Sequence, residues 1–249
     1  MSHRVWIGTS GYNYPEWRGT FYPDKMKPAD MLTFYGAAFD SVEINYTFYR
    51  MPSAKNIESW AGDTPEDFRF VLKAPKRITH DKRLRDFGDT LAVFVRLSAG
   101  LEGRLGPLLF QLPPNLKKDL PRLEAFLDEL PDTARAAFEF RHESWFDEDV
   151  FTALRSRGAA LCAADSEKIS APIVRTAAFS YFRLRDEGYQ DADIAAWTAK
   201  VREASKSGEV YVFFKHEDSG KGPAFAQQMK GLLRDYSSDA NATIADSAQ

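Results

Sequence analysis

Short runs of apolar residues recur along the chain, and most of them alternate with polar residues or end at a turn residue. Eight of these runs have the length and the alternation that are typical of β-strands. They cover residues 4–10, 39–46, 68–74, 107–112, 136–142, 159–166, 179–185 and 209–216. We therefore expect eight strands, each bounded by residues that favour turns or helix caps.

Most of the segments between these strands carry apolar residues at helical spacing. The leucines and the phenylalanine of residues 119–130 fall on one face of a helix. Residues 147–158 begin with acidic side chains and end at Gly158, as helices commonly do. Comparable patterns cover residues 28–39, 89–101, 191–208 and 222–236. Strand and helix thus alternate along the chain.

This alternation predicts an α/β protein, a single-domain (β/α)8 barrel of the TIM type. A doubly wound open sheet is the alternative, and the lack of a Gly-rich dinucleotide loop makes it the weaker one. Only "SEKISAPIVRTAA" lies between the sixth and seventh strands, so we expect an irregular connection there. The barrel is predicted to span residues 1–236. Residues 237–249 are small and polar and are predicted to be a disordered tail.

Composition narrows the class of protein further. Hydrophobic residues make up 44% and charged residues 28%, which is usual for globular proteins. The net charge of −3 argues against nucleic-acid binding over the whole surface, although a local basic cleft stays open. The single Cys162 excludes an intramolecular disulfide framework. Because we find neither a run of about 18 apolar residues nor a secretory signal, we expect a cytoplasmic protein without a membrane segment. The oligomeric state is left open.

Polar residues close the predicted strands at the end where a TIM barrel carries its active site. Strand alternation directs one or two polar side chains inward at this rim from seven of the eight strands. The inward set is Glu43, Asn45, Lys73, Gln111, Glu139, Arg141, Asp165, Tyr181 and Arg183, with either Lys215 or His216 from the last strand. Any one of these residues, taken alone, would be interpreted as part of a structural ion pair or as a solvated residue at a strand end. Burying the whole set without partners would cost several kcal/mol, so the set predicts a polar pocket.

Charge suggests what this pocket binds. Lys73, Arg141 and Arg183 are inward cations, and converging cations favour a phosphate or a carboxylate, which arginine binds through two parallel hydrogen bonds. We therefore expect a small anionic ligand. Pairing of these cations with Glu43 and Glu139 inside the protein is the alternative, and the sequence leaves it open.

Acid–base chemistry is also available at the rim. We expect Glu43 and Glu139 to be catalytic, assisted by Asp165 and His142. The two glutamates come from strands three apart and would face each other across the barrel, an arrangement that a glycosidase-like hydrolase could use. His142 could instead serve as a hydrogen-bonding residue at the strand end.

The remaining candidates are aromatic and polar groups near the mouth. The predicted substrate-binding set is Asn45, Tyr46, Lys73, Gln111, Arg141, Trp145, Tyr181, Arg183 and His216. Aromatic side chains on the loops could stack on a flat ligand, and the basic stretch from Lys73 to Arg85 leaves nucleic-acid binding open. No His-x-His or His-Glu-x-x-His spacing supports a metal site, and the neighbouring lysines and arginines argue against one. A divalent ion held by Glu43, Glu139, Asp165 and His216 is therefore only a minor alternative, and we assign no metal and name no cofactor.

Several long stretches resemble one protein family. They are "WIGTSGYNYPEWRGTFYP", "FDSVEINYTFYRMPS", "FRFVLKAPKRITHDKRL", "LFQLPPNL", "FEFRHESWF" and "VYVFFKHEDSGKGPAFAQQM". The chain resembles the YecE-like family, also called domain of unknown function 72 (DUF72), from about Val5 to Leu233. The resemblance implies a TIM-type barrel, in agreement with the strand count. It implies no particular biochemical activity.

These observations lead to one function hypothesis and two alternatives. We expect an enzyme, a hydrolase or a lyase, that acts on a small anionic or nucleotide-like substrate at the C-terminal rim of the barrel. A non-catalytic protein that binds nucleic acid or another ligand is the first alternative. A glycosidase-like hydrolase is the second.

Overall fold

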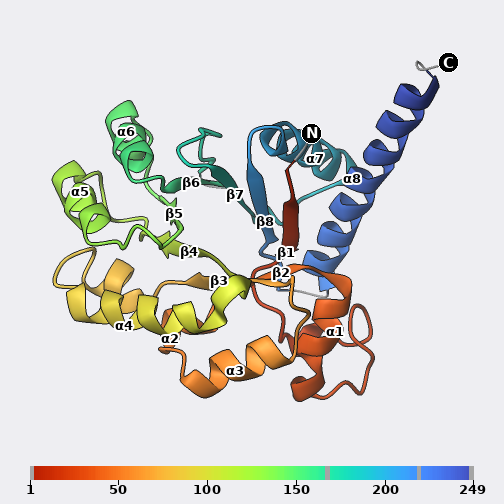
Figure 1. The fold of residues 1–249 in the computed structure, drawn as a ribbon, viewed down its shortest axis with the longest axis horizontal. Helices are drawn as coiled ribbons and strands as arrows, with labels where there is room; N and C mark the ends of the chain where they lie inside the picture. Colours follow the sequence, from red (N-terminus) through yellow and green to blue (C-terminus); the bar gives the residue numbers. More distant parts are fainter. Residues whose placement is uncertain (1–2, 166–168, 218–219, 247–249) are drawn as a thin grey trace.

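The structure is a computed structural model that describes residues 3–165, 169–217 and 220–246, with side chains up to Arg234. These residues form eight parallel strands in the order β1-β8-β7-β6-β5-β4-β3-β2 (Figure 1). The strands are β1 (Val5–Thr9), β2 (Ser41–Ile44), β3 (Arg69–Lys73), β4 (Leu105–Gln111), β5 (Ala136–Glu139), β6 (Ala160–Ala164), β7 (Phe179–Leu184) and β8 (Glu209–Phe214). The sheet curls into a nearly closed barrel, which confirms the predicted α/β barrel.

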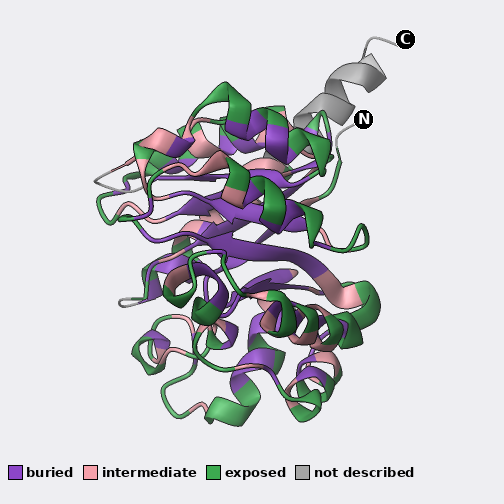
Figure 2. Cartoon of the chain, turned by 90° about the vertical axis from the view of Figure 1, so that its left-hand side faces the viewer, coloured by how far each residue is buried: buried purple, intermediate pink, exposed green. Residues whose placement is uncertain are grey.

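Helices cover the outside of the barrel. They are α1 (Met31–Ala38), α3 (Ala54–Gly62), α4 (Gly88–Ser98), α5 (Leu120–Asp128), α6 (Glu148–Ser156), α7 (Asp191–Ser205) and α8 (Lys221–Asp246). Shorter helical pieces lie in the loops: η1 (Pro15–Trp17), η2 (Pro28–Asp30), α2 (Tyr46–Tyr49), η3 (Arg77–Asp81), η4 (Ala99–Arg104) and η5 (Glu143–Trp145). The strands are buried, while the helices expose one face to solvent (Figure 2).

Polar side chains cap the first turns of several of these helices. The Asp119 carboxylate accepts a hydrogen bond from the backbone at the start of α5, and Asp147 does the same at the start of α6. Ser53 and Asn56 form a reciprocal capping box at α3, with distances of 3.2 and 3.0 Å. Such caps satisfy backbone N–H groups that the first helical turn leaves free.

The last helix extends beyond the predicted end of the barrel domain. α8 includes residues 237–246, where the sequence predicts a disordered tail. The backbone is helical there, and alanines such as Ala240 and Ala242 are compatible with a helix. The remaining residues of the predicted tail, 247–249, lie outside the described residues.

The connection from β6 to β7 differs from the other crossovers. Residues 169–178 form no helix, which confirms the predicted irregular connection within its described part. The Thr176 hydroxyl donates to the Ala159 carbonyl and accepts from the Leu161 N–H, both at 2.7 Å. A cavity of about 360 Å³ lies here, lined in part by the outer faces of β6 and β7 and by α7.

Strands β1 and β2 close the barrel near its C-terminal end with little direct pairing. Ser10 and Glu43 form an isolated parallel bridge, and the Gly11 N–H donates to the Glu43 carbonyl at 2.7 Å. The backbones come so close that a Cβ on Gly8 would lie 1.9 Å from the Ser41 carbonyl oxygen. Glycine is therefore required at this point of the seam.

Nearer the N-terminal end, side chains replace the hydrogen bonds of a ladder between β1 and β2. The Ile7 N–H donates to the Asp40 carboxylate at 3.1 Å. The phenol of Tyr35, from α1, accepts from the Thr9 N–H at 2.7 Å and donates to the Ser41 carbonyl at 3.1 Å. Backbone groups that no neighbouring strand satisfies thus find partners at the seam.

The core has two layers. The larger layer lies between the strands and the helices and contains outward-facing residues such as Phe110 and Phe138. The smaller layer fills the barrel, where Trp6 and Tyr211 lie among small residues that include Ala137 and Cys162. Cys162 is a buried free cysteine. Above this inner layer, towards the C-terminal ends, the inward side chains become polar.

Candidate functional site

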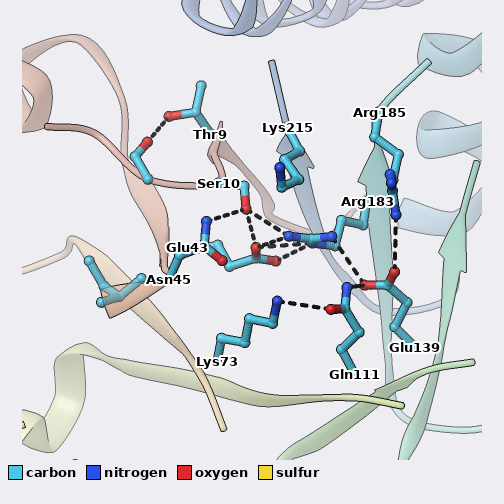
Figure 3. Close-up of polar contacts among 12 residues, drawn as sticks. Thr9, Ser10, Glu43, Asn45, Lys73, Gln111, Glu139, Arg183, Arg185 and Lys215 are labelled. Carbon is cyan, nitrogen blue, oxygen red and sulfur yellow. Dashed lines mark hydrogen bonds and ion pairs between the residues drawn. The ribbon is translucent and has the colours of Figure 1, made fainter. Parts of the chain in front are cut away.

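Polar side chains from the C-terminal ends of the strands meet in one hydrogen-bonded network inside the barrel. Its buried members are Ser10, Glu43, Lys73, Gln111, Glu139, Tyr181 and Arg183. Figure 3 shows Arg183 between Glu43 and Glu139. Apart from Ser10, these residues belong to the set that strand alternation directs inward, and their side chains do point to one place.

Arg183 and Glu43 form the centre of the network. The Arg183 Nε lies 3.0 and 3.1 Å from the two Glu43 carboxylate oxygens, and its Nη2 lies 2.9 Å from Oε1. The Tyr181 hydroxyl donates to Glu43 Oε2 at 2.6 Å. Ser10 donates to Glu43 Oε1 and accepts from the Asn45 amide at 2.9 Å. Glu43 therefore has charged or hydroxyl partners on both oxygens.

The network continues from Arg183 to Lys73. The Arg183 Nη1 lies 3.2 Å from Glu139 Oε2, which also accepts from the Gln111 side-chain amide at 2.7 Å. The other atom of that amide, Gln111 Oε1, accepts from the Lys73 Nζ at 2.9 Å. Gln111 thus connects a buried carboxylate to a buried lysine.

Both carboxylates of the network are ionised. Burial by itself would raise their pKa values, but the charge of Arg183 and the hydrogen bonds outweigh burial, so the pKa values of Glu43 and Glu139 lie below their usual range. The reverse balance holds for the Arg183 guanidinium, whose pKa is raised despite burial because both glutamates stabilise its charge. Neither glutamate is protonated near neutral pH, so neither is ready to donate a proton.

Two further arginines approach the network from the solvent side. Arg185 Nη1 lies 3.7 Å and Arg141 Nε lies 3.9 Å from Glu139 Oε1, and these side chains are 23% and 29% exposed. Three arginines therefore share two carboxylates in the described ion pairs. Lys215, close by, is paired with Glu217 at 3.0 Å. The mouth of the barrel is thus rich in positive charge.

Lys73 lies in surroundings that disfavour its charged form. Its Nζ lies 4.1 Å from the centre of the Phe48 ring, and the residue is 7% exposed. Burial first, and then the charge of Arg183, lower the pKa of Lys73 to about 7. Lys73 is therefore a group that can exchange a proton near neutral pH.

His80 extends this part of the site. Its ring packs edge-on against Phe48 at 4.9 Å, and its Nδ1 lies 2.9 Å from the Thr79 hydroxyl. Burial, followed by the charges of Lys73 and Arg141, lowers the pKa of His80 to about 4. The imidazole is therefore neutral under ordinary conditions, next to the cations of the mouth.

Asp165 does not point into the barrel, and this expectation is corrected. Cys162 and Ala164 occupy the inward positions of β6, so the next residue points outward. Asp165 accepts the backbone N–H of Arg185 at 2.8 Å and the hydroxyl of Tyr189. It lines a separate cavity of about 240 Å³ between the strand ends and α7.

The His216 side chain also points outward from the barrel. Of Lys215 and His216, Lys215 is therefore the residue that faces the mouth. The His216 Nε2 lies 2.6 Å from the Asp186 carbonyl. Its ring packs against Tyr189 and Phe225, with centres 5.6 and 5.1 Å apart. Burial lowers the pKa of His216. The prediction that His216 joins the central pocket is therefore wrong in its geometry.

Three other residues of the predicted site have contacts that are separate from the central network. His142 accepts the Ser144 N–H at 3.2 Å and caps η5. Trp145 is fully buried, donates to a main-chain carbonyl at 2.7 Å and stacks on Phe140. Tyr46 is 42% exposed on α2. None of the described hydrogen bonds connects these three side chains to the central network.

Sequence reasoning missed some residues of the mouth. Arg185 follows Arg183 by two positions, so alternation along β7 contains the signal for it. His80 and Phe48 lie on loops, where no periodic pattern marks them. Their approach to Lys73 depends on how the loops after β2 and β3 fold over the mouth.

Among the described residues, no three or more His, Cys, Asp or Glu side chains are grouped so that they could hold a metal ion. No helix in this part of the chain is both long enough and apolar enough to cross a membrane.

Comparison with known protein sequences identifies relatives. UPF0759 protein YecE of Escherichia coli (strain K12) is 30% identical over 173 residues, which cover 67% of this chain and 61% of that protein. UPF0759 protein YunF of Bacillus subtilis (strain 168) is 29% identical over 150 residues, covering 57% of this chain and 52% of that protein. The chain thus aligns with little more than half the length of these relatives.

Solved structures agree with the barrel architecture. A DUF72 family protein from Thermotoga maritima MSB8 has a TM-score of 0.85 at 30% sequence identity, over 93% of this chain and 100% of that chain. A DUF72 family protein from Enterococcus faecalis V583 has a TM-score of 0.79 at 18% identity, over 92% and 95% of the two chains, and shows the fold alone. The model of one family, described as "Protein of unknown function DUF72", matches residues 6–248. The chain therefore belongs to the DUF72 family.

Proposed function

We propose that this protein is an enzyme that binds a small anionic substrate at the C-terminal mouth of its barrel. One observation carries the proposal: Arg141 and Arg185 converge on the outer oxygen of Glu139, whose other oxygen is already paired with Arg183. The carboxylates of the protein do not balance this positive charge, so the mouth favours an anionic ligand. Partly exposed arginines can bind such a ligand through bidentate hydrogen bonds.

The proposed roles differ from those that the sequence suggests. Arg141 and Arg185 bind the anion, because they are the arginines of the network that solvent reaches. Arg183 holds Glu43 and Glu139 as a buried framework, since both carboxylates are ionised and almost fully buried. Lys73 exchanges protons with the substrate. An enzyme needs such a group with a pKa near the working pH.

The two alternatives have less support. A glycosidase needs one carboxyl group with a raised pKa as its acid, whereas the pKa values of Glu43 and Glu139 are both lowered. Nucleic-acid binding would use the basic stretch beside the mouth. There Lys76 pairs with Asp81 at 3.6 Å and Lys82 with Asp86 at 3.9 Å, so part of its positive charge is already balanced.

Anion binding tests the proposal directly. We expect inorganic phosphate and malonate to raise the melting temperature of the protein and to give a calorimetric binding signal. The double variant Arg141→Ala/Arg185→Ala should bind at least about tenfold more weakly, because a hydrogen bond to a charged group contributes on the order of 1.5–3 kcal/mol. Equal binding by the wild type and the double variant would contradict the proposal, as would no binding at all.

Two controls complete this experiment. Arg155→Ala removes an exposed arginine of α6 that pairs with Glu148, and it should leave anion binding unchanged. A single-stranded DNA oligonucleotide tests the nucleic-acid alternative. Binding that weakens steeply with salt and exceeds phosphate binding by orders of magnitude would favour that alternative over a small substrate.

A further inference from the structure

The geometry at the end of β3 points to covalent chemistry. We propose that Lys73 forms an imine with the carbonyl carbon of a small anionic oxo compound, a 2-oxo acid or a compound of the same chemistry. This inference rests on the proposed function, because the arginines of the mouth hold the anionic group of the same substrate.

The immediate partners of the Lys73 amine are uncharged. Its Nζ donates to the amide oxygen of Gln111 at 2.9 Å and lies over the Phe48 ring at 4.1 Å. No ion pair among the described residues includes Lys73. A buried lysine that is paired with a carboxylate keeps its proton, whereas one beside an amide and an aromatic ring can lose it. Lys73 has the second kind of surroundings.

Gln111 holds the amine in a defined position. Its Nε2 donates to Glu139 Oε2 at 2.7 Å, which fixes the direction of the amide and turns Oε1 towards Lys73. One N–H of the amine is therefore engaged. A neutral amine keeps a second N–H and a lone pair, and the lone pair is the nucleophile. Gln111 is thus a positioning residue.

Electrostatics agrees with this geometry. The pKa of Lys73 is lowered to about 7 by burial and by Arg183, so much of the amine is neutral near neutral pH. Activation of a lysine by an apolar pocket and a neighbouring cation is an established way to make an amine nucleophilic.

The reaction balances without an oxidant or a reductant. The Nζ lone pair attacks the carbonyl carbon, a C–N bond forms, and the electron pair of the C=O π bond moves to oxygen. That oxygen takes one proton from the nitrogen and becomes the hydroxyl of a carbinolamine. The hydroxyl then leaves with the second nitrogen proton as water, and the C=N bond of the imine forms. A proton from solvent makes the imine cationic and electron-withdrawing.

Reductive trapping tests this inference. The protein is incubated at pH 7.5 with glyoxylate, the smallest 2-oxo acid, and sodium cyanoborohydride, and modified lysines are identified by peptide mass mapping. We expect Lys73 to be carboxymethylated at least about tenfold faster than the exposed Lys25 and Lys55. An ordinary lysine has a pKa of about 10.4 and is almost entirely protonated at this pH. A rate at Lys73 no higher than at these exposed lysines would overturn the inference.

Variants separate the contributions of the site. Arg141→Ala/Arg185→Ala should slow the labelling of Lys73 by glyoxylate at least about tenfold, but should affect labelling by uncharged acetaldehyde much less. Gln111→Glu places a carboxylate beside the amine and keeps it protonated, so labelling at pH 7.5 should fall. Labelling that is equally fast in all of these variants would show that the mouth does not assist the reaction and would contradict the inference.

The experiment distinguishes failure of the inference from failure of the proposed function. Lys73→Arg replaces the amine by a guanidinium that cannot form an imine, so the label at residue 73 should be lost. If the wild type binds phosphate but Lys73 is not trapped, the imine is excluded and the anion-binding enzyme stands. If neither occurs, both proposals fail. Circular dichroism and the melting temperature show that each variant is folded.

Discussion

At the scale of the residue, Lys73 titrates differently in the folded barrel and in the unfolded chain. Burial and Arg183 lower its pKa to about 7, whereas a lysine in an unfolded chain has a pKa of about 10.4. Between these values the unfolded state binds one more proton than the folded state. The folding equilibrium must therefore depend on pH through this side chain.

The sign of this dependence gives a prediction. Because the unfolded state binds the extra proton, the free energy of unfolding should rise as pH increases from about 7.5 to about 10, by up to about 1.4 kcal/mol per pH unit. Lys73→Met should remove this contribution, which chemical denaturation at several pH values would measure as a flatter profile. The matched control is Lys25→Met at an exposed site. Parallel profiles for the wild type and Lys73→Met would contradict the prediction.

At the scale of the element, the connection from β6 to β7 has no helix in its described part to pack against the barrel. A side chain of the connection stabilises β6 instead. The Thr176 hydroxyl takes the place of a neighbouring backbone for two groups of this region. It donates a hydrogen bond to the Ala159 carbonyl and accepts one from the Leu161 N–H. Both groups are buried. Without the hydroxyl they would lack these partners, and an unsatisfied buried polar group costs on the order of 1–3 kcal/mol.

Thr176→Val tests this role with almost no change in side-chain volume. We expect the free energy of unfolding to fall by about 1–3 kcal/mol in urea denaturation. Thr198→Val is the control, because the equally buried Thr198 hydroxyl donates only to the Ile194 carbonyl within α7, which a helical N–H can also satisfy. A loss for Thr176→Val no larger than that for Thr198→Val would show that the connection does not depend on this hydroxyl.

At the scale of the whole molecule, the barrel is held together across strands that are not neighbours. Arg183 of β7 binds Glu43 of β2 and Glu139 of β5 through the interior. The strands that bracket the seam, β1 and β2, meet through a single bridge and through the Tyr35 phenol and the Asp40 carboxylate rather than through a full ladder. The positions of the polar strand ends therefore depend on closure of the entire barrel.

Tyr35→Phe tests closure at the seam. Removal of the hydroxyl leaves the Thr9 N–H and the Ser41 carbonyl without this partner, so we expect a loss of about 1–3 kcal/mol in the free energy of unfolding. Amide hydrogen exchange at Thr9 should accelerate selectively, because the seam opens locally. The exposed Tyr46→Phe should change neither quantity. Unchanged exchange at Thr9 in Tyr35→Phe would rule out this account of the seam.

Much of the site follows from one local rule. Alternation along a strand places Glu43, Lys73, Gln111, Glu139 and Arg183 on one side, and the structure brings all five together. The phase of this alternation is assigned wrongly at Asp165 and left open between Lys215 and His216. Counted from the inward residues of β6 and β8, Asp165 and His216 fall on the outward side. A shift of one residue reverses every side chain, and the ends of short strands contain little pattern to resolve it.

The amino-acid sequence alone determined the class of fold, the number of strands, the irregular connection and the polar character of one rim, because these depend on periodicity over neighbouring residues. Only the tertiary structure decided which charges neutralise each other and which remain available. Arg183 is buried between two glutamates while Arg141 and Arg185 stay partly exposed, although all three are arginines at strand ends. Burial and distance between residues far apart in the chain control the pKa of Lys73, and neither quantity is contained in a local pattern.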